Sequence, residues 1–319
     1  PSDQLAVVEL GMNHPGETAQ LAATAQANIA LINNAQREHQ EFMTTVAAVA
    51  EEHSDAIRAL PKEGFAVFPA DSEFSGVWRE AAAGRKVIDF VLASTQKVTE
   101  ASVTGRLLSN GHVQVQTEQG VVEIHLKTLG SHNVRNALAA SAVALAAGVG
   151  LEKIKEGLES FSPVNGRMQA KKLDPNHTLI DDSYNANPDS VRAAIDALKQ
   201  SGNLSWLVLG DMGEVGDQGP EFHREVGAYA AEQGITKLFA LGVQCELAVQ
   251  GFDAAKKNSA AANAIHFSDM DSLISQVRDA FYAQSSGSNQ HLNILVKGSR
   301  FMRMERVVQA LLEEAKTCS

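Results

Sequence analysis

Residues 177–188 read His-Thr-Leu-Ile-Asp-Asp-Ser-Tyr-Asn-Ala-Asn-Pro. The apolar run at their start predicts a buried strand over 177–182, and Pro188 suits the first turn of a following helix. The polar side chains between the two exceed what helix capping requires. We therefore favour a functional role for Asp182, whose carboxylate can accept hydrogen bonds from ribose hydroxyls. A capping box followed by a helix-starting proline is the structural alternative.

The alternation of strand and helix continues from this stretch to the end of the chain. It predicts a doubly wound open sheet, in which ligands bind at the carboxyl ends of the strands. Polar loops also follow the strands that end near Gly210 and Val296. The expected strands cover 177–182, 206–210, 237–241, 264–267 and 293–296, and the expected helices cover 189–200, 220–234, 244–251, 270–283 and 302–315.

The part before residue 167 predicts a mainly parallel sheet with an antiparallel patch. Its strand and helix patterns alternate as in βαβ units, and a Glu-Gln-Gly turn joins two runs of period two into a hairpin. The turn-rich segment 162–166 marks a boundary between domains 1–167 and 168–319. The expected strands cover 5–10, 29–32, 113–117 and 121–126, and the expected helices cover 17–27, 42–60, 133–147 and 151–161.

Composition excludes several classes of protein. The 319 residues suggest two domains, and 44% hydrophobic with 20% charged residues is typical of a packed globular chain. A net charge of -11 argues against binding to nucleic acid or to an anionic membrane. The two cysteines cannot build a disulfide framework, which favours the cytoplasm. The longest uncharged apolar-rich stretch, 136–151, is too short to span a bilayer, and no signal peptide is visible.

Two residues near expected strand ends suggest a metal site. Glu9 closes the first expected strand, and His39 lies in the loop after the second. Side chains at the ends of adjacent parallel strands can meet and hold a hard divalent ion. The alternative is that Glu9 caps the helix near Glu17 and that His39 is solvated. Spacing alone favours this alternative.

Two further segments leave function and structure open. Asn133 and Asn136 share one face at a helix start, where their amides suit a base edge. The alternative is that Ser131 and Asn133 cap this helix. Lys297, Ser299 and Arg300 follow the last strand. They suit an anionic group such as a carboxylate, or they form a glycine turn with solvated cations.

Six segments occur together and in order: V-V-E-L-G-M-N-H-P-G-E, S-H-N-V-R-N-A-L-A-A, N-G-R-M, D-D-S-Y-N-A-N-P, L-G-D-M-G-E-V-G and V-K-G-S-R. With them the chain resembles the Mur ligases of peptidoglycan synthesis. The fourth and sixth segments favour the branch that adds D-alanyl-D-alanine to UDP-N-acetylmuramoyl-tripeptide. The resemblance implies a central ATP-binding domain followed by a Rossmann-like domain for the amine, and a monomeric cytoplasmic enzyme that uses ATP and Mg²⁺.

The resemblance also implies roles for individual residues. Glu9 and His39 match metal-binding positions, and His39 is also expected to contribute to catalysis. Asn133 and Asn136 match the segment against the adenine, and Asp182 matches a ribose-binding aspartate. Arg167 matches an arginine that reaches the nucleotide phosphates. The residues expected to face the amine substrate are Tyr184, Asn185, Lys297, Ser299 and Arg300, and we expect Arg167 and Lys297 to be catalytic.

One position departs from the family pattern. A lysine that the family modifies to a metal-bridging carbamate is absent, and His53 lies opposite it. We expect His53 to bind the metal through a neutral imidazole, or Glu52 to supply the missing charge; the alternative is a solvated charged helix face.

The chain also lacks the phosphate loop G-x-x-x-x-G-K-[ST] and an initiator methionine. Both absences predict that it starts inside the central domain and that, isolated, it is inactive. The chain also has no G-x-G-x-x-G motif after a strand, which argues against an ordinary NAD enzyme. The alternative function is a non-catalytic nucleotide- or peptide-binding module.

Overall fold

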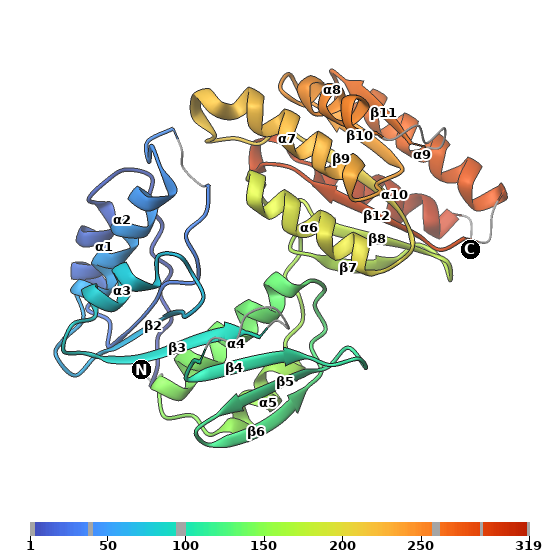
Figure 1. Ribbon diagram of the computed structural model, residues 1–319. Coiled ribbons are helices and arrows are strands. Elements are labelled where there is room, and N and C mark those ends of the chain that lie inside the picture. Colours follow the sequence, from blue (N-terminus) through green and yellow to red (C-terminus); the bar gives the residue numbers. More distant parts are fainter. Residues whose placement is uncertain (1–3, 38–40, 94–99, 257–261, 288–289, 318–319) are drawn as a thin grey trace. The chain divides into compact units, whose positions relative to one another are not determined.

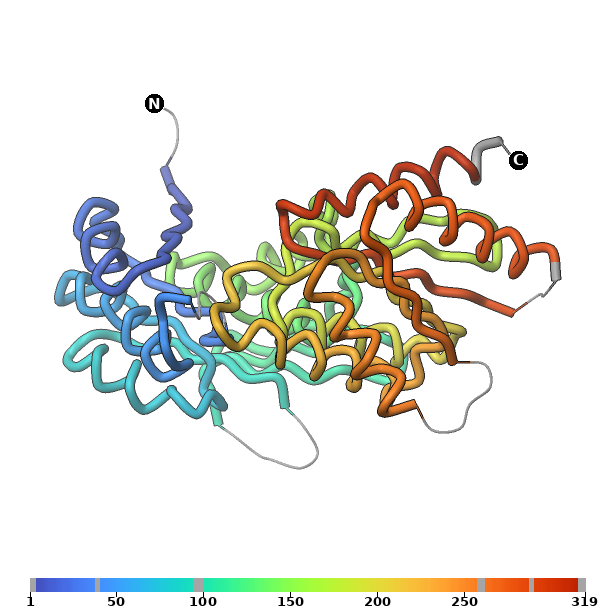
Figure 2. Tube along the Cα trace, turned by 90° about the horizontal axis from the view of Figure 1, so that it is seen from above, coloured from blue at the N-terminus to red at the C-terminus, as the bar shows by residue number. Residues whose placement is uncertain are grey.

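The computed structural model describes residues 4–37, 41–93, 100–256, 262–287 and 290–317. The chain divides into two compact units, one formed by residues 1–127 and 132–161 and the other by 128–131 and 162–319. The first can be followed from blue to green and the second from yellow to red (Figure 2). The expected boundary near residue 167 falls just inside the second unit and stays a prediction.

The first unit is built on one six-stranded sheet with the order β1-β2-β3-β4-β5-β6 (Figure 1). Strands β1 to β4 run parallel, and β5 and β6 continue antiparallel. This confirms the mainly parallel sheet with an antiparallel patch. The strands are β1 (Ile29–Leu31), β2 (Phe65–Pro69), β3 (Lys86–Leu92), β4 (Val103–Leu107), β5 (Val113–Thr117) and β6 (Gly120–Ile124); the helices are α1 (Glu17–Ala25), α2 (Val46–Arg58), α3 (Ser75–Ala81), α4 (Ser131–Ala146) and α5 (Leu151–Ser160).

Helices cover both faces of this sheet because its strands alternate their side chains. Val67 of β2 packs in the cluster that contains α4 and α5, whereas its neighbours Ala66 and Phe68 pack with α2 and α3. Successive side chains of a strand point to opposite faces, so a strand with apolar residues at consecutive positions needs cover on both sides. The first unit therefore has two apolar layers.

The expected strand over residues 5–10 is wrong. These residues make no sheet pairing, and Val7 is 98% exposed. A strand forms only where a neighbouring strand offers its backbone groups, and the sequence pattern cannot show whether such a neighbour exists. Residues 5–10 run extended outside the sheet.

The second unit has its own six-stranded sheet, with the order β11-β10-β9-β12-β8-β7. All neighbours are parallel except β7, which runs antiparallel at the edge. This confirms the Rossmann-like, doubly wound prediction. The strands are β7 (Gln169–Lys172), β8 (His177–Asp182), β9 (Leu204–Gly210), β10 (Lys237–Leu241), β11 (Asn263–Phe267) and β12 (Leu292–Lys297); the helices are α6 (Pro188–Gln200), α7 (Gly219–Glu232), α8 (Cys245–Ala255), α9 (Met270–Gly287) and α10 (Glu305–Thr317), with 3₁₀ turns η1 (Gly216–Gln218) and η2 (Arg300–Met302).

Two apolar clusters lie on the two faces of the second sheet. Leu207 and Leu209 of β9 pack with α6, α7 and α8, whereas Trp206 and Val208 pack with α9 and α10. The helices can be seen on either side of the sheet in Figure 1. The sheet is thus covered on both faces, and its carboxyl-end loops stay available for ligands.

The sequence reading missed β2, β3, β4, β7 and α3. Strands β2 and β3 are short runs that are buried at consecutive positions, with Phe68 and Phe90 fully buried, whereas β7 is a four-residue polar strand at the sheet edge. Such runs cannot be told from buried helix by periodicity alone. Among the helices of the described ranges, none combines the length and apolarity that crossing a bilayer requires.

Candidate active site

Asp182 and Lys297 meet at the carboxyl ends of two neighbouring parallel strands. They are register partners in β8 and β12, and the Lys297 ammonium lies 2.6 Å from Oδ2 of Asp182. Lys297 is only 4% exposed. A buried ammonium requires a counter-charge, and Asp182 supplies it.

This ion pair joins two loops of the second unit. The other oxygen of Asp182 accepts a hydrogen bond from the backbone N–H of Met168 at 3.0 Å. Lys297 also donates to the backbone oxygen of Asn185 at 3.0 Å. The pair therefore holds the backbone at Met168, before β7, and at Asn185, after β8.

Ser299 adds the loop after β9 to the same cluster. Its hydroxyl donates to the oxygen of Ala186 at 3.1 Å and accepts from the N–H of Gly213 at 2.7 Å. Gly298 allows the close approach, because a Cβ atom there would lie 3.1 Å from Cα of Gly210. The loops after β8, β9 and β12 thus form one connected surface.

Arg167 lies on the aromatic ring of Tyr184. The guanidinium carbon is 4.3 Å from the ring centroid, and both residues are exposed. The backbone N–H of Tyr184 donates to the oxygen of Gly166 at 3.0 Å, which holds the ring beside the arginine. Within the described ranges no carboxylate pairs with Arg167. A stacked guanidinium keeps its N–H edge available for an anion.

The remaining predicted residues of the second unit have local partners. Oδ1 of Asn185 accepts from the N–H of Ala186 at 2.8 Å, and Arg300 pairs with Glu305 at 3.1 Å on the surface. The capping alternative is also present: Asn187 and Ser190 form a capping box before α6. Capping accounts for Asn187 but not for Asp182.

Asn133 and Asn136 lie together in the first turn of α4. Nδ2 of Asn136 donates to Oδ1 of Asn133 at 3.4 Å, and Oδ1 of Asn136 accepts from the side chain of Asn33 at 2.8 Å. The loop after β1 thus reaches the start of α4. The amide nitrogen of Asn133 also lies 3.2 Å from the ring of His132, so these side chains belong to one hydrogen-bonded network.

The predicted metal residues of the first unit are only partly described. Glu9 is exposed in the extended segment, and His53 is half-buried in α2. His39 lies outside the described residues. Glu52 does not supply a free charge, because its two oxygens accept hydrogen bonds from the backbone of Gly16 and Thr18 at 2.8 and 2.9 Å.

Glu52, and not Glu9, therefore receives the amides at the start of α1. Glu9 makes no hydrogen bond within the described ranges, so the capping alternative for it is wrong. An exposed carboxylate without other partners is a donor that suits Mg²⁺. Glu9 fits such an ion, whereas Glu52 does not.

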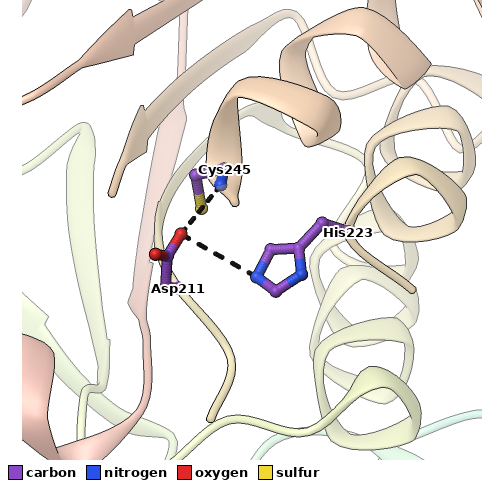
Figure 3. A group of neighbouring side chains, drawn as sticks. All are labelled: Asp211, His223 and Cys245. Atoms are coloured by element: carbon purple, nitrogen blue, oxygen red, sulfur yellow. Dashed lines mark hydrogen bonds and ion pairs between the residues drawn. The ribbon is translucent and has the colours of Figure 1, made fainter. Parts of the chain in front are cut away.

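Three donor groups of the second unit lie within 4.8 Å of one another: Asp211, His223 and Cys245 (Figure 3). Nε2 of His223 accepts from the N–H of Met212 at 2.9 Å, so its Nδ1 carries the proton and donates to the oxygen of Gly219 at 2.7 Å. Asp211 accepts from the N–H of Cys245 at 2.8 Å, at the start of α8. The other oxygen of Asp211 accepts from the N–H of Gln244 at 3.3 Å, so both ring nitrogens and both carboxylate oxygens are already used.

The electrostatics of this group agree with a structural role. Burial lowers the pKa of His223 below its ordinary value, and burial raises the pKa of the Cys245 thiol, with the nearby Asp211 charge adding to the rise. A metal would require the thiolate, which burial disfavours. Asp211, His223 and Cys245 thus hold the loop after β9 against α7 and α8. The sequence pattern does not predict a site at these three residues, and no motif marks His223.

A cavity of about 110 Å³ lies elsewhere in the second unit. Lys237 and Asn263, which line it, start β10 and β11. The cavity is therefore at the amino ends of these strands and takes no part in the carboxyl-end cluster.

The sequence of the chain matches a known family of ligases. Residues 2–144 match the model described as "Mur ligase middle domain", and residues 166–300 match the "Mur ligase, glutamate ligase domain". A relative from Escherichia coli strain K12 is 35% identical over 320 residues, covering all of this chain and 67% of the relative. The chain belongs to the Mur ligase family.

The relatives belong to one branch of that family. The Escherichia coli protein and a Haemophilus influenzae protein, 35% identical over 98% of this chain and 65% of its own length, are both named UDP-N-acetylmuramoyl-tripeptide--D-alanyl-D-alanine ligase. A crystal structure of MurF from Acinetobacter baumannii superposes with a TM-score of 0.82 at 31% identity, over 95% of this chain and 63% of that one. The chain spans about two thirds of the length of these relatives.

Proposed function

We propose that the chain forms the middle and C-terminal parts of an ATP-dependent ligase that adds D-alanyl-D-alanine to UDP-N-acetylmuramoyl-tripeptide. The names of the relatives support this substrate pair. The observation that carries the proposal is the carboxyl-end cluster of the second unit, with the exposed Arg167 beside it. Such a cluster can bind anions and amines at one edge of the sheet.

The reaction must overcome the low reactivity of a carboxylate. Transfer of the γ-phosphoryl group of ATP to the carboxylate oxygen releases ADP and forms an acyl phosphate. The amine nitrogen then attacks the carbonyl carbon, the amine loses a proton, and the C–O bond to phosphate breaks. Peptide, ADP and phosphate are the products, and the transferring phosphoryl charge requires cationic partners.

Arg167 is the protein cation best placed to meet that charge. The ring of Tyr184 holds its guanidinium, and the Asp182 carboxylate holds the N–H of the next residue. Its position is thus fixed before a phosphate arrives, so little conformational freedom is lost on binding. We assign it to the nucleotide phosphates.

The other roles follow from the available donors and acceptors. We assign Asn133 and Asn136 to the adenine. Asp182 would bind the ribose, since each of its oxygens accepts one hydrogen bond and can accept a second. The amine substrate is assigned to the carboxyl ends of β8 and β12, where Tyr184, Asn185 and Arg300 are exposed. Lys297 and Ser299 are buried there and would act by holding these loops in place.

We assign the metal to Glu9, with His39 and His53 as further ligands. Bound Mg²⁺ would neutralise phosphate charge. Glu9 supplies an exposed oxygen donor to such an ion. The cytoplasm is the proposed location, and the proposed state is a monomer.

The test measures phosphate release by the full-length gene product with UDP-N-acetylmuramoyl-tripeptide, ATP and D-alanyl-D-alanine. We expect release that requires all three. Arg167→Lys keeps the charge but loses the planar, stacked group, and should lower kcat/KM for ATP about tenfold or more. Arg192→Lys is the matched control, because Arg192 stacks on Tyr229 at 3.9 Å in the same unit. Equal effects of both changes, or release without D-alanyl-D-alanine, would contradict the proposal.

The isolated 319-residue chain is expected not to turn over, because it has no phosphate loop. Isothermal titration separates this view from a free-standing binding module. The module would bind ATP tightly without further protein, whereas we expect weak binding. Release of ADP that depends on D-alanyl-D-alanine would disprove the prediction.

A further inference from the structure

Arg135 connects the start of α4 with the loop after β2. Its two terminal nitrogens donate to the two oxygens of Asp71 at 2.9 and 2.6 Å. The contact is bidentate and joins residues 64 positions apart in the sequence. Bidentate arginine–carboxylate pairs fix orientation as well as distance.

The pair is partly shielded from water. The side chains of Arg135 and Asp71 are 35% and 22% exposed. Exposed ion pairs contribute little, whereas shielding and paired hydrogen bonds strengthen the contact. This pair can therefore hold the backbone to which it is attached.

Arg135 lies between the two asparagines of the same helical turn. Asn136 is held from another direction, because it accepts from Asn33 in the loop after β1. The loops after the neighbouring parallel strands β1 and β2 thus both bind the segment 133–136 of α4. The buried face of α4, with Val134 and Leu138, already attaches the helix to the sheet.

We propose that Asp71 is a positioning residue for base recognition. Acting through Arg135, it fixes the first turn of α4 so that Asn133 and Asn136 present their amides in one orientation. This inference rests on the proposed function, in which these amides meet the adenine. Asp71 itself does not touch the nucleotide.

The consequence is selectivity for the base. Adenine and guanine differ in the donors and acceptors on their edges, so discrimination requires amides held in a fixed orientation. If this turn becomes less rigid, the preference for adenine over guanine should fall. The contacts that all nucleotides share should weaken less. A residue with a purely structural role would instead affect all nucleotides equally.

The test compares kcat and KM for ATP and for GTP in the full-length gene product. Asp71→Asn keeps the shape but loses the charge and one acceptor oxygen. We expect KM for ATP to rise about tenfold with kcat nearly unchanged, and the ATP/GTP ratio of kcat/KM to fall by a similar factor. Asp71→Glu keeps a carboxylate and should restore most of the ratio.

Asp55→Ala is the control, since it removes the carboxylate that pairs with Arg58 at 2.8 Å in the same unit. Thermal unfolding of all three variants shows whether each is folded. An Asp71→Asn variant that keeps the ATP/GTP ratio, loses activity equally with both nucleotides, or is not rescued by glutamate would overturn the inference. If the unaltered enzyme does not use ATP or does not prefer it, the proposed function itself fails.

Discussion

His223 shows at the level of one residue how a buried polar group becomes structural. The ring is fully buried, and each nitrogen has one backbone partner, Met212 or Gly219. Burial lowers the pKa of this histidine, which favours the neutral ring in the folded chain. Histidine, aspartate and cysteine within reach of one another are therefore not sufficient for a metal centre.

The lowered pKa of His223 predicts a pH-dependent stability. The unfolded chain takes up a proton at this ring near pH 6.5, whereas the folded chain takes it up only at a lower pH. The free energy of unfolding is thus fully retained above this pH and falls as the pH drops below it. In His223→Gln the oxygen still accepts from Met212, so we expect a loss of about 1–3 kcal/mol at pH 7 but a flatter pH profile.

The profile of His223→Gln is measured by urea unfolding between pH 5 and pH 8, a range of about three units around the ordinary histidine pKa. His291→Gln serves as the control, because His291 is an exposed histidine of the same unit. In this control the free energy of unfolding should change with pH as steeply as in the unaltered chain. Equal slopes for all three proteins would contradict the assignment.

Tyr184 is expected to act through its ring. One face of the ring carries Arg167, so a contact with the amine substrate would use the opposite face, the edge or the hydroxyl. Tyr184→Phe removes the hydroxyl alone and should leave KM for ATP nearly unchanged, whereas Tyr184→Leu removes the stacking surface and should raise it severalfold. Steady-state kinetics of the full-length gene product decides; an equal rise in both variants would assign the effect to the hydroxyl.

Helices α7 and α8 show at the level of elements how glycine sets a helix contact. A Cβ atom on Gly227 would lie 1.8 Å from the backbone oxygen of Ala248, and one on Gly251 would lie 2.1 Å from that of Arg224. Neither obstacle is a flexible side chain. The two helices can therefore pack this closely only because these positions have no side chain.

Gly227→Ala should push α7 and α8 apart. Overpacking against backbone costs about 1–3 kcal/mol or more, which exceeds the gain in helix propensity of about 1 kcal/mol. We expect a lower unfolding midpoint in urea. Gly157→Ala in α5 is the comparison, because nothing lies within 4 Å of its Cβ position. Its effect should have the opposite sign, and a stabilising Gly227→Ala would refute the packing argument.

At the scale of the whole molecule, each unit has its own core. The apolar clusters on the two faces of the second sheet contain only residues of the second unit, and those of the first sheet contain only residues of the first unit. The two tryptophans of the chain, Trp78 and Trp206, are fully buried, one in each unit. Each indole therefore reports on one core.

Unfolding should accordingly be resolved into two transitions. In Trp78→Phe the remaining indole follows the second unit, and in Trp206→Phe it follows the first, so the reporter lies in the unaltered unit each time. We expect different urea midpoints by fluorescence, because separate cores unfold separately. Far-ultraviolet circular dichroism of the unaltered chain should show two unfolding transitions, one at each of these midpoints. Coincident midpoints would mean that the chain unfolds as one cooperative body.

The second sheet was largely predictable, because strands such as β9 and β12 are apolar throughout and are followed by polar loops. In the first unit, the sequence pattern does not predict β2 to β4. It predicts a strand over residues 5–10, which do not pair with any strand of the sheet. Of the site, the sequence indicated Asp182, Lys297 and Ser299 but not their contacts. Asp71 was not found, because it follows a strand that the pattern did not show.

The sequence alone determined the fold class and the loops that carry polar residues, because apolar periodicity and local turn chemistry are properties of neighbouring residues. It also indicated the family, through six short motifs in a fixed order. Only the tertiary structure decided which of those polar groups meet. It paired Lys297 with Asp182 and Arg135 with Asp71, and it assigned Glu52 to a helix start instead of a metal. These contacts join residues 115, 64 and 36 positions apart, and strand order, which no local pattern encodes, brings such residues together.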